Sequence, residues 1–200
     1  PTEFVGYNNE RTEGKIIEII IKDKPVKELL ENQEGIIITN QTCFYAEAGG
    51  QVGDIGLIKS HNSIFEVSDT QKYFGDFYLH FGKVKEGKII SNQTAVLIVD
   101  REHRKNVKAN HSATHLLHAA LRETLGKHVA QKGSYVGPER LRFDFSHNKA
   151  ILKEEINKIN LEVNEIIKQN ENVSTRLMSP TKAIKEGAMA LFGEKYGEEV

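Results

Sequence analysis

Residues 95–121 read AVLIVDREHRKNVKANHSATHLLHAAL, and the hydrophobic pattern changes its period inside this stretch. Residues 95–99 form a short, mostly branched run typical of a strand, whereas apolar residues after Asp100 recur with helical spacing. Asp100 is a suitable N-cap, and Gly126 a suitable end, for a helix over residues 101–127. The stretch therefore predicts a boundary near residue 100 between a β-rich part and a part that opens with a helix.

The sequence before this boundary predicts strands. Residues 14–22 and 36–39 are further branched apolar runs, and glycine, proline and asparagine signals separate the runs. Several short strands with such spacing favour a small antiparallel β-barrel over residues 1–100.

The sequence after the boundary mixes both periods. Residues 140–145 alternate like a strand, residues 152–170 have the spacing of an amphipathic helix, and residues 173–178 suggest another strand. Pro180 opens a short helix that Gly187 is expected to end. We therefore expect an α+β protein, with the barrel followed by an α/β sandwich subdomain over residues 101–200.

Composition excludes several classes of protein. The 27 basic and 28 acidic residues give a net charge of −1, so any RNA contact must come from local basic patches. The candidate patches are Arg140, Arg142 and residues 101–108, and the alternative is that these residues only form a solvated surface. The single cysteine, Cys43, excludes an internal disulfide and is expected to be packed rather than reactive. No apolar run is long enough for a transmembrane helix. Because the chain opens with Pro1 rather than Met, we expect a piece of a longer protein.

Two histidines, His111 and His115, are the first candidates for chemistry. Side chains four residues apart share one face of a helix, and neutral imidazoles so placed are good zinc ligands. On a helical wheel His118 lies near them, nearly opposite the apolar stripe, so we expect none of the three in the core. A zinc-protease site is excluded, because Ser112 stands where that motif has its glutamate. The alternative is a polar surface without a metal.

Two further segments could serve a site. Residues 42–56 read TCFYAEAGGQVGDIG, a glycine-rich segment that lets a ligand approach the backbone closely, or simply a tight barrel turn. It lacks the lysine of a triphosphate-binding loop. Gln131-Lys-Gly-Ser134 offers an amide and a hydroxyl that could orient substrate or water, or is an ordinary connection.

Taken together, these segments resemble one family, the editing region of bacterial-type alanyl-tRNA synthetases. The resemblance covers essentially the whole chain. It rests on six motifs in the family's order: residues 2–7 (TEFVGY), 44–51 (FYAEAGGQ) with Asp54 and Gly56, 111–115 (HSATH), 131–134 (QKGS), 141–147 (LRFDFSH) and 187–197 (GAMALFGEKYG).

The resemblance implies a cytoplasmic enzyme that acts on tRNA. The editing region hydrolyses tRNA(Ala) wrongly charged with serine or glycine, and the parent synthetase attaches alanine to tRNA(Ala) with ATP. Editing is needed because an alanine pocket cannot fully exclude a smaller glycine, or a serine that only adds a hydroxyl. The expected partners are the acceptor end of tRNA(Ala) and the rest of the synthetase chain, without a membrane.

The resemblance also assigns roles to residues. His111 and His115 would be zinc ligands, with Thr114 beside the metal and Gln131 in the editing pocket as catalytic candidates. Thr42 would hydrogen-bond the serine hydroxyl. Gly49, Gly50 and Gln51 of the glycine-rich segment would complete the substrate-binding set.

The zinc site implied by the resemblance is expected to be incomplete in this chain. The family takes its other two ligands from a Cys-x-x-x-His segment that follows the motif at residues 187–197, and the chain ends at Val200. His118, His128 and His147 are substitutes that the family pattern does not support. We therefore expect weak zinc binding, or none, and impaired catalysis.

Two alternatives stay open. The chain could be a free-standing trans-editing deacylase of the same superfamily, although its opening and closing motifs resemble the synthetase more. It could instead be a non-catalytic tRNA-binding module with a surface histidine face. Hydrolysis of Ser-tRNA(Ala) separates an enzyme from a binding module.

Overall fold

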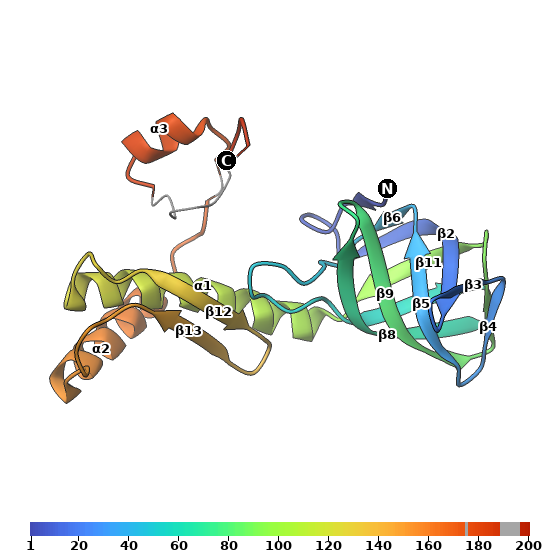
Figure 1. The fold of residues 1–200 in the computed structure, drawn as a ribbon, viewed down its shortest axis with the longest axis horizontal. Coiled ribbons are helices and arrows are strands. Elements are labelled where there is room, and N and C mark those ends of the chain that lie inside the picture. The colour runs from blue at the N-terminus through green and yellow to red at the C-terminus, as the bar shows by residue number, and fades with distance from the viewer. Residues whose placement is uncertain (175, 189–196) are drawn as a thin grey trace. The chain divides into compact units, whose positions relative to one another are not determined.

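The computed structural model describes residues 1–174, 176–188 and 197–200 (Figure 1). The chain divides into two compact units, Pro1–Val163 and Asn164–Val200, which are described separately. The change from strands to helix falls at residue 100, whereas the compact units divide at residue 163. The predicted domain boundary at residue 100 therefore stays a prediction.

The first unit contains a closed antiparallel barrel, which confirms the predicted α+β fold with a barrel (Figure 1). Strand β11 pairs with β2 and so closes the ring of neighbours. In order around the barrel the strands are β2 (Arg11–Ile21), β5 (Glu34–Thr39), β9 (Phe77–Glu86), β8 (Ser63–Tyr73), β7 (Gly56–Ser60) and β11 (Thr94–Val99).

Five short strands extend this framework. In chain order they are β1 (Glu3–Phe4), β3 (Lys24–Val26), β4 (Glu28–Leu30), β6 (Gln41–Thr42) and β10 (Lys88–Ile90). Strand β1 runs parallel to β6, β4 pairs with β10, and β3 pairs with the end of β2. The pairing of β1 with β6 ties the start of the chain to the start of the glycine-rich segment.

The barrel interior follows from the alternation of side chains along each strand. In β11, Ala95, Leu97 and Val99 are buried while the intervening residues are less so. Ile16, Ile37 and Phe65 from three other strands meet them in one core. Removing this apolar surface from water is the main term that stabilises the barrel.

The helix α1 (Arg101–Leu125) begins directly after β11. The Asp100 carboxylate accepts a hydrogen bond from the backbone N–H of His103 at 2.9 Å, and the N–H of Gly126 bonds the Arg122 carbonyl. Both predicted ends of this helix are therefore confirmed to within two residues. The first backbone N–H groups of a helix have no partner within the helix, and the Asp100 carboxylate supplies an acceptor for one of them at this point.

A hairpin lies along α1 (Figure 1). Its strands are β12 (Gln131–Val136) and β13 (Leu141–Phe145), and β13 confirms the strand predicted from residues 140–145. Ala120 and Leu121 of α1 pack with Val129 and with Ile159 of α2 (Lys153–Gln169) in a second core.

The second unit carries the helix α3 (Pro180–Lys185), and Gly187 follows it with a positive φ of 94°, as expected for a helix end. The strand predicted over residues 173–178 is absent from the described residues of that range, where only Met178 exchanges backbone hydrogen bonds with Val200. Most of the motif at residues 187–197 lies outside the described residues. In the described part of the chain, no helix is both long and apolar enough to cross a membrane.

Candidate functional site

The predicted histidine pair lies on one exposed face of α1. The rings of His111 and His115 stack, with centroids 5.0 Å apart and planes inclined by 18°. Nearby protein atoms partly desolvate His111, which lowers its pKa from the ordinary value, and the charge of His115 lowers that pKa further. The His111 ring therefore tends toward the neutral form that can bind a metal ion.

The glycine-rich segment reaches this pair through Gln51. The side-chain Oε1 of Gln51 lies 2.6 Å from Nδ1 of His111. Sequence reasoning placed Gln51 among substrate-binding residues, and the structure places it directly against a candidate metal ligand.

The same segment docks on β12 by backbone hydrogen bonds. The N–H of Val136 donates to the Gly50 carbonyl at 2.8 Å, and the N–H of Val52 donates to the Val136 carbonyl at 3.0 Å. A Cβ on Gly50 would lie 2.4 Å from the carbonyl oxygen and from Oγ of Ser134, and Gly50 has a positive φ of 86°. Glycine is required here because the two backbones approach so closely.

Gln131 begins β12 and belongs to the same arrangement. Its Nε2 donates to Oγ of Ser134 at 3.3 Å, and that hydroxyl donates to the Gly49 carbonyl at 3.1 Å. The Gln131-Lys-Gly-Ser134 segment is thus a strand rather than a plain connection. The glycine-rich segment contacts both His111 and the hairpin that carries Gln131.

Thr114 occupies the buried side of α1. Its hydroxyl donates to the Asn110 carbonyl at 2.8 Å, one turn back along the helix. The Asn110 side chain in turn donates to the Gly137 carbonyl at 2.8 Å, which ties the helix to the end of β12. Thr114 therefore lies one residue from His115 but has its proton engaged within the helix.

Thr42 lies in the barrel interior. Its Oγ1 is 2.8 Å from Nε2 of His80 and accepts a hydrogen bond from the N–H of Phe44 at 3.1 Å. Both Thr42 and His80 are fully buried. The predicted contact of Thr42 with a serine substrate stays a prediction, and these contacts do not support it.

His118 corrects an expectation. It was placed on the polar face with His111 and His115, but it is buried against Phe143, with ring centroids 4.9 Å apart. Burial lowers its pKa, and the charge of Arg122 lowers it further. A buried stripe of α1 contains Val107, Thr114, His118 and Leu121, spaced by seven, four and three residues. Two of its members are polar, so the stripe is not apparent from hydrophobicity alone.

Arg104 and Asp54 form a contact that sequence reasoning missed. The basic run at residues 101–108, a candidate tRNA surface, includes Arg104, yet the Arg104 side chain is 5% exposed and pairs with the buried carboxylate of Asp54. Its guanidinium also donates to the carbonyls of Gly6, Asn9 and Cys43. The available signal was Asp54, an acidic residue directly before an apolar residue of the glycine-rich segment, because a buried charge needs a partner.

The described residues contain no group of three or more histidine, cysteine or acidic side chains able to hold a metal ion. His128 and His147 form a separate pair, with Nε2 and Nδ1 2.9 Å apart. Among the described residues, His111 and His115 therefore offer two candidate metal ligands. Gln51 lies against the Nδ1 atom of His111, which leaves its Nε2 atom facing away from Gln51.

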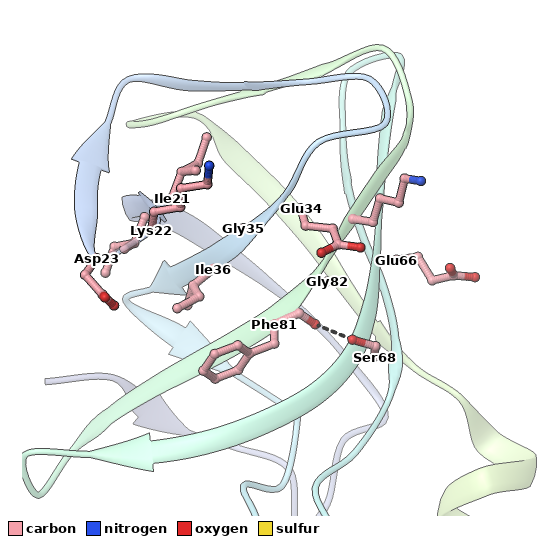
Figure 2. A pocket seen from close by; sticks show the side chains of 12 residues that line it. Ile21, Lys22, Asp23, Glu34, Gly35, Ile36, Glu66, Ser68, Phe81 and Gly82 are labelled. Carbon is pink, nitrogen blue, oxygen red and sulfur yellow. Dashed lines mark hydrogen bonds between the residues drawn. The ribbon is translucent and has the colours of Figure 1, made fainter.

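A hollow of about 650 Å³ lies on the barrel, away from these residues (Figure 2). Glu34, Gly35 and Gly82 lie among its lining residues, and Ser68 donates a hydrogen bond to the Phe81 carbonyl at 3.3 Å. Its lining contains neither histidine nor cysteine.

Comparison with known proteins places the chain in a class. The family model described as tRNA synthetases class II (A) matches residues 1–103, just over half of the chain. The chain therefore belongs to the class II (A) tRNA synthetases.

Within that class the chain is similar to alanine–tRNA ligases over its whole length. It is 52% identical over 200 residues to the enzyme of Parvibaculum lavamentivorans, 52% over 199 residues to that of Chelativorans sp. strain BNC1, and 52% over 200 residues to that of Mesorhizobium japonicum. It covers 22% of each of these proteins. The similarity includes the histidines of α1 and the hairpin of β12 and β13, which lie beyond the residues that the family model matches.

Proposed function

We propose that this chain is the part of an alanine–tRNA ligase that hydrolyses the ester of tRNA(Ala) wrongly charged with serine or glycine. The observation that carries the proposal is the meeting of three segments. The glycine-rich segment bonds His111 through Gln51 and contacts the start of the Gln131 hairpin through Gly49. The parent protein would attach alanine to tRNA(Ala) using ATP.

The arrangement suits ester hydrolysis on a bound aminoacyl group. The Nε2 donor of His111 and the ring nitrogens of His115 lie on one face, and the Gln131 amide, whose NH₂ group donates to Ser134, keeps its oxygen as an acceptor. That oxygen could receive a hydrogen bond from the substrate's ammonium or hydroxyl group. The site would act as a second sieve after an imperfect alanine pocket.

The two histidines fit part of a zinc site. Imidazole nitrogens are a usual donor type for zinc, and His111 and His115 lie one helical turn apart. Gln51 lies against Nδ1 of His111, and metal-binding histidines commonly have such a partner on the nitrogen that does not bind the metal. Held by His111 and His115, zinc would polarise a water or ester oxygen, or anchor the aminoacyl group. Thr114, next to His115, is the proposed neighbour of this metal.

The proposal is tested by single-turnover deacylation of Ser-tRNA(Ala) and Gly-tRNA(Ala), with Ala-tRNA(Ala) for comparison. We expect release of serine and glycine above the spontaneous rate, and much slower release of alanine. The variants His111→Ala and Gln131→Ala should reduce release by roughly 100-fold, the usual effect of losing a positioned polar group.

A matched control is His61→Asn, which removes a histidine from an exposed barrel turn where φ is 47°, a conformation that asparagine tolerates. This variant should deacylate like the unmodified chain. If the chain bound tRNA tightly but did not release serine faster than the spontaneous rate, the proposal would be wrong and the chain would be a non-catalytic binding module.

A further inference from the structure

We propose that Gln51 is a positioning residue that holds His111 in the tautomer with its proton on Nδ1, leaving Nε2 as the lone-pair donor toward metal or substrate. The inference deepens the proposed function and rests on it for its meaning. The tautomer itself can be measured without any activity.

The direction of the hydrogen bond follows from the atoms that meet. The amide oxygen of Gln51 has no proton to give, and it lies 2.6 Å from Nδ1 of His111. The proton between them must therefore belong to Nδ1, and a neutral ring with Nδ1–H has its free lone pair on Nε2. Metal-binding histidines are commonly fixed in this way, by an acceptor on the nitrogen that does not bind the metal.

The backbone holds Gln51 on two sides. Its N–H donates to the Ala48 carbonyl at 3.0 Å, and its own carbonyl accepts from the Ala48 N–H at 3.1 Å. The flanking residues Gly50 and Val52 are bonded to Val136 of β12. The backbone of Gln51 is therefore already held in place by its own hydrogen bonds. Less conformational entropy is then lost when the amide side chain contacts His111.

An amide serves this purpose differently from a carboxylate. A carboxylate against Nδ1 would favour the doubly protonated imidazolium, and His115 stacked at 5.0 Å disfavours a charge on its neighbour. The uncharged acceptor fixes the proton on Nδ1 without drawing a second proton to Nε2. Gln51 thus sets which nitrogen is available while leaving the ring neutral.

The test is the tautomer of His111 in the metal-free, ¹⁵N-labelled 200-residue chain, read from long-range ¹H–¹⁵N spectra at about pH 8, where imidazoles are neutral. His111→Asn identifies the signals of this ring by their loss. We expect His111 with its proton on Nδ1. The variant Gln51→Leu should shift the ring toward the Nε2–H form, whereas Gln51→Glu, which keeps an acceptor oxygen, should retain Nδ1–H.

The control is Gln33→Leu, which removes the same side chain from a barrel turn, where Gln33 accepts from the N–H of Leu30 at 2.8 Å. It should leave the His111 signals unchanged.

Two results would overturn the inference: an Nε2–H ring in the unmodified chain, or a His111 tautomer that Gln51→Leu leaves unchanged. Failure of the proposed function looks different. In that case His111 would keep its Nδ1 proton and respond to Gln51→Leu as described, while the chain released no serine from Ser-tRNA(Ala).

Discussion

Cys43 illustrates how burial decides the chemistry of one residue. It lies in the barrel core with no exposed surface, and this desolvation raises the pKa of its thiol to about 11. The thiolate is the reactive form, so the packed cysteine expected from sequence is also an inert one.

Cys43 should therefore resist a thiol reagent such as DTNB at neutral pH while the barrel is folded. Reaction should appear only as urea unfolds the chain, with the same midpoint as the loss of structure followed by circular dichroism. Rapid labelling of the folded protein would show that the barrel opens locally at β6 and the glycine-rich segment.

His80 makes the stability of the barrel depend on pH. The ring is fully buried, and desolvation lowers its pKa to about 4, although its hydrogen bond to the Ile37 carbonyl acts in the opposite direction. Between about pH 6.5 and pH 4 the unfolded chain binds a proton that the folded chain does not. Stability is therefore complete above that window and declines as the pH falls through it.

We expect the His80 contribution to reach about 3 kcal/mol across this window, from the pKa difference alone. Urea unfolding at a series of pH values measures it. The variant His80→Gln, which cannot titrate, should unfold with a flatter pH dependence even though it is less stable at neutral pH. Equal pH slopes in the two proteins would contradict the assignment.

Among the elements, the glycine-rich segment has the strictest local geometry. Gly49 and Gly50 both have a positive φ, so alanine at either position carries a left-handed penalty of about 1–2 kcal/mol. Only at Gly50 would the new Cβ also meet Ser134 at 2.4 Å, whereas at Gly49 it meets nothing within 4 Å.

Gly50→Ala should therefore displace the segment from β12, and Gly49→Ala should not. We expect both variants to stay folded, with the lower thermal stability in Gly50→Ala, because the displaced segment loses its backbone hydrogen bonds to Val136. Deacylation should be slower by about 100-fold in Gly50→Ala alone, since small displacements of a site have effects of that size. Comparable deacylation rates would mean that the backbone pairing with β12 is not needed for the site.

The elements were more predictable than their contacts. The ends of α1 follow from Asp100 and Gly126, because capping is local chemistry. The meeting of Gln51 with His111 joins residues far apart in sequence, and no periodicity encodes it. His118 and Arg104 were misjudged because polar residues on a buried stripe look like a solvated face until their partners, Phe143 and Asp54, are known.

At the scale of the first compact unit, one buried ion pair joins the barrel segments to the helix. Asp54 accepts from Arg104 and from the N–H of Tyr45 at 2.7 Å, so the pair anchors the first turn of α1 beside the glycine-rich segment. Removing one member would leave the other charge buried and unpaired.

Arg104→Met should lower the free energy of unfolding by about 3–5 kcal/mol. Asp54→Asn should have a smaller effect, because Arg104 keeps its bonds to the carbonyls of Gly6, Asn9 and Cys43. Arg101→Met, which breaks an exposed pair with Glu10, is the control and should change stability by less than about 1 kcal/mol. Urea denaturation measures all three, and equal effects of Arg104→Met and Arg101→Met would refute the anchoring role.

The closing pair of the barrel has a consequence for synthesis on the ribosome. Strand β11 must pair with β2, which precedes it in the chain with four other barrel strands between them, and α1 begins only two residues after β11 ends. Pairings between strands that are distant in sequence form slowly. The barrel of the nascent chain therefore remains incomplete until β11 has left the ribosome. Ring closure and growth of the histidine helix then follow almost together, which makes the histidine site one of the last parts of this unit to assemble.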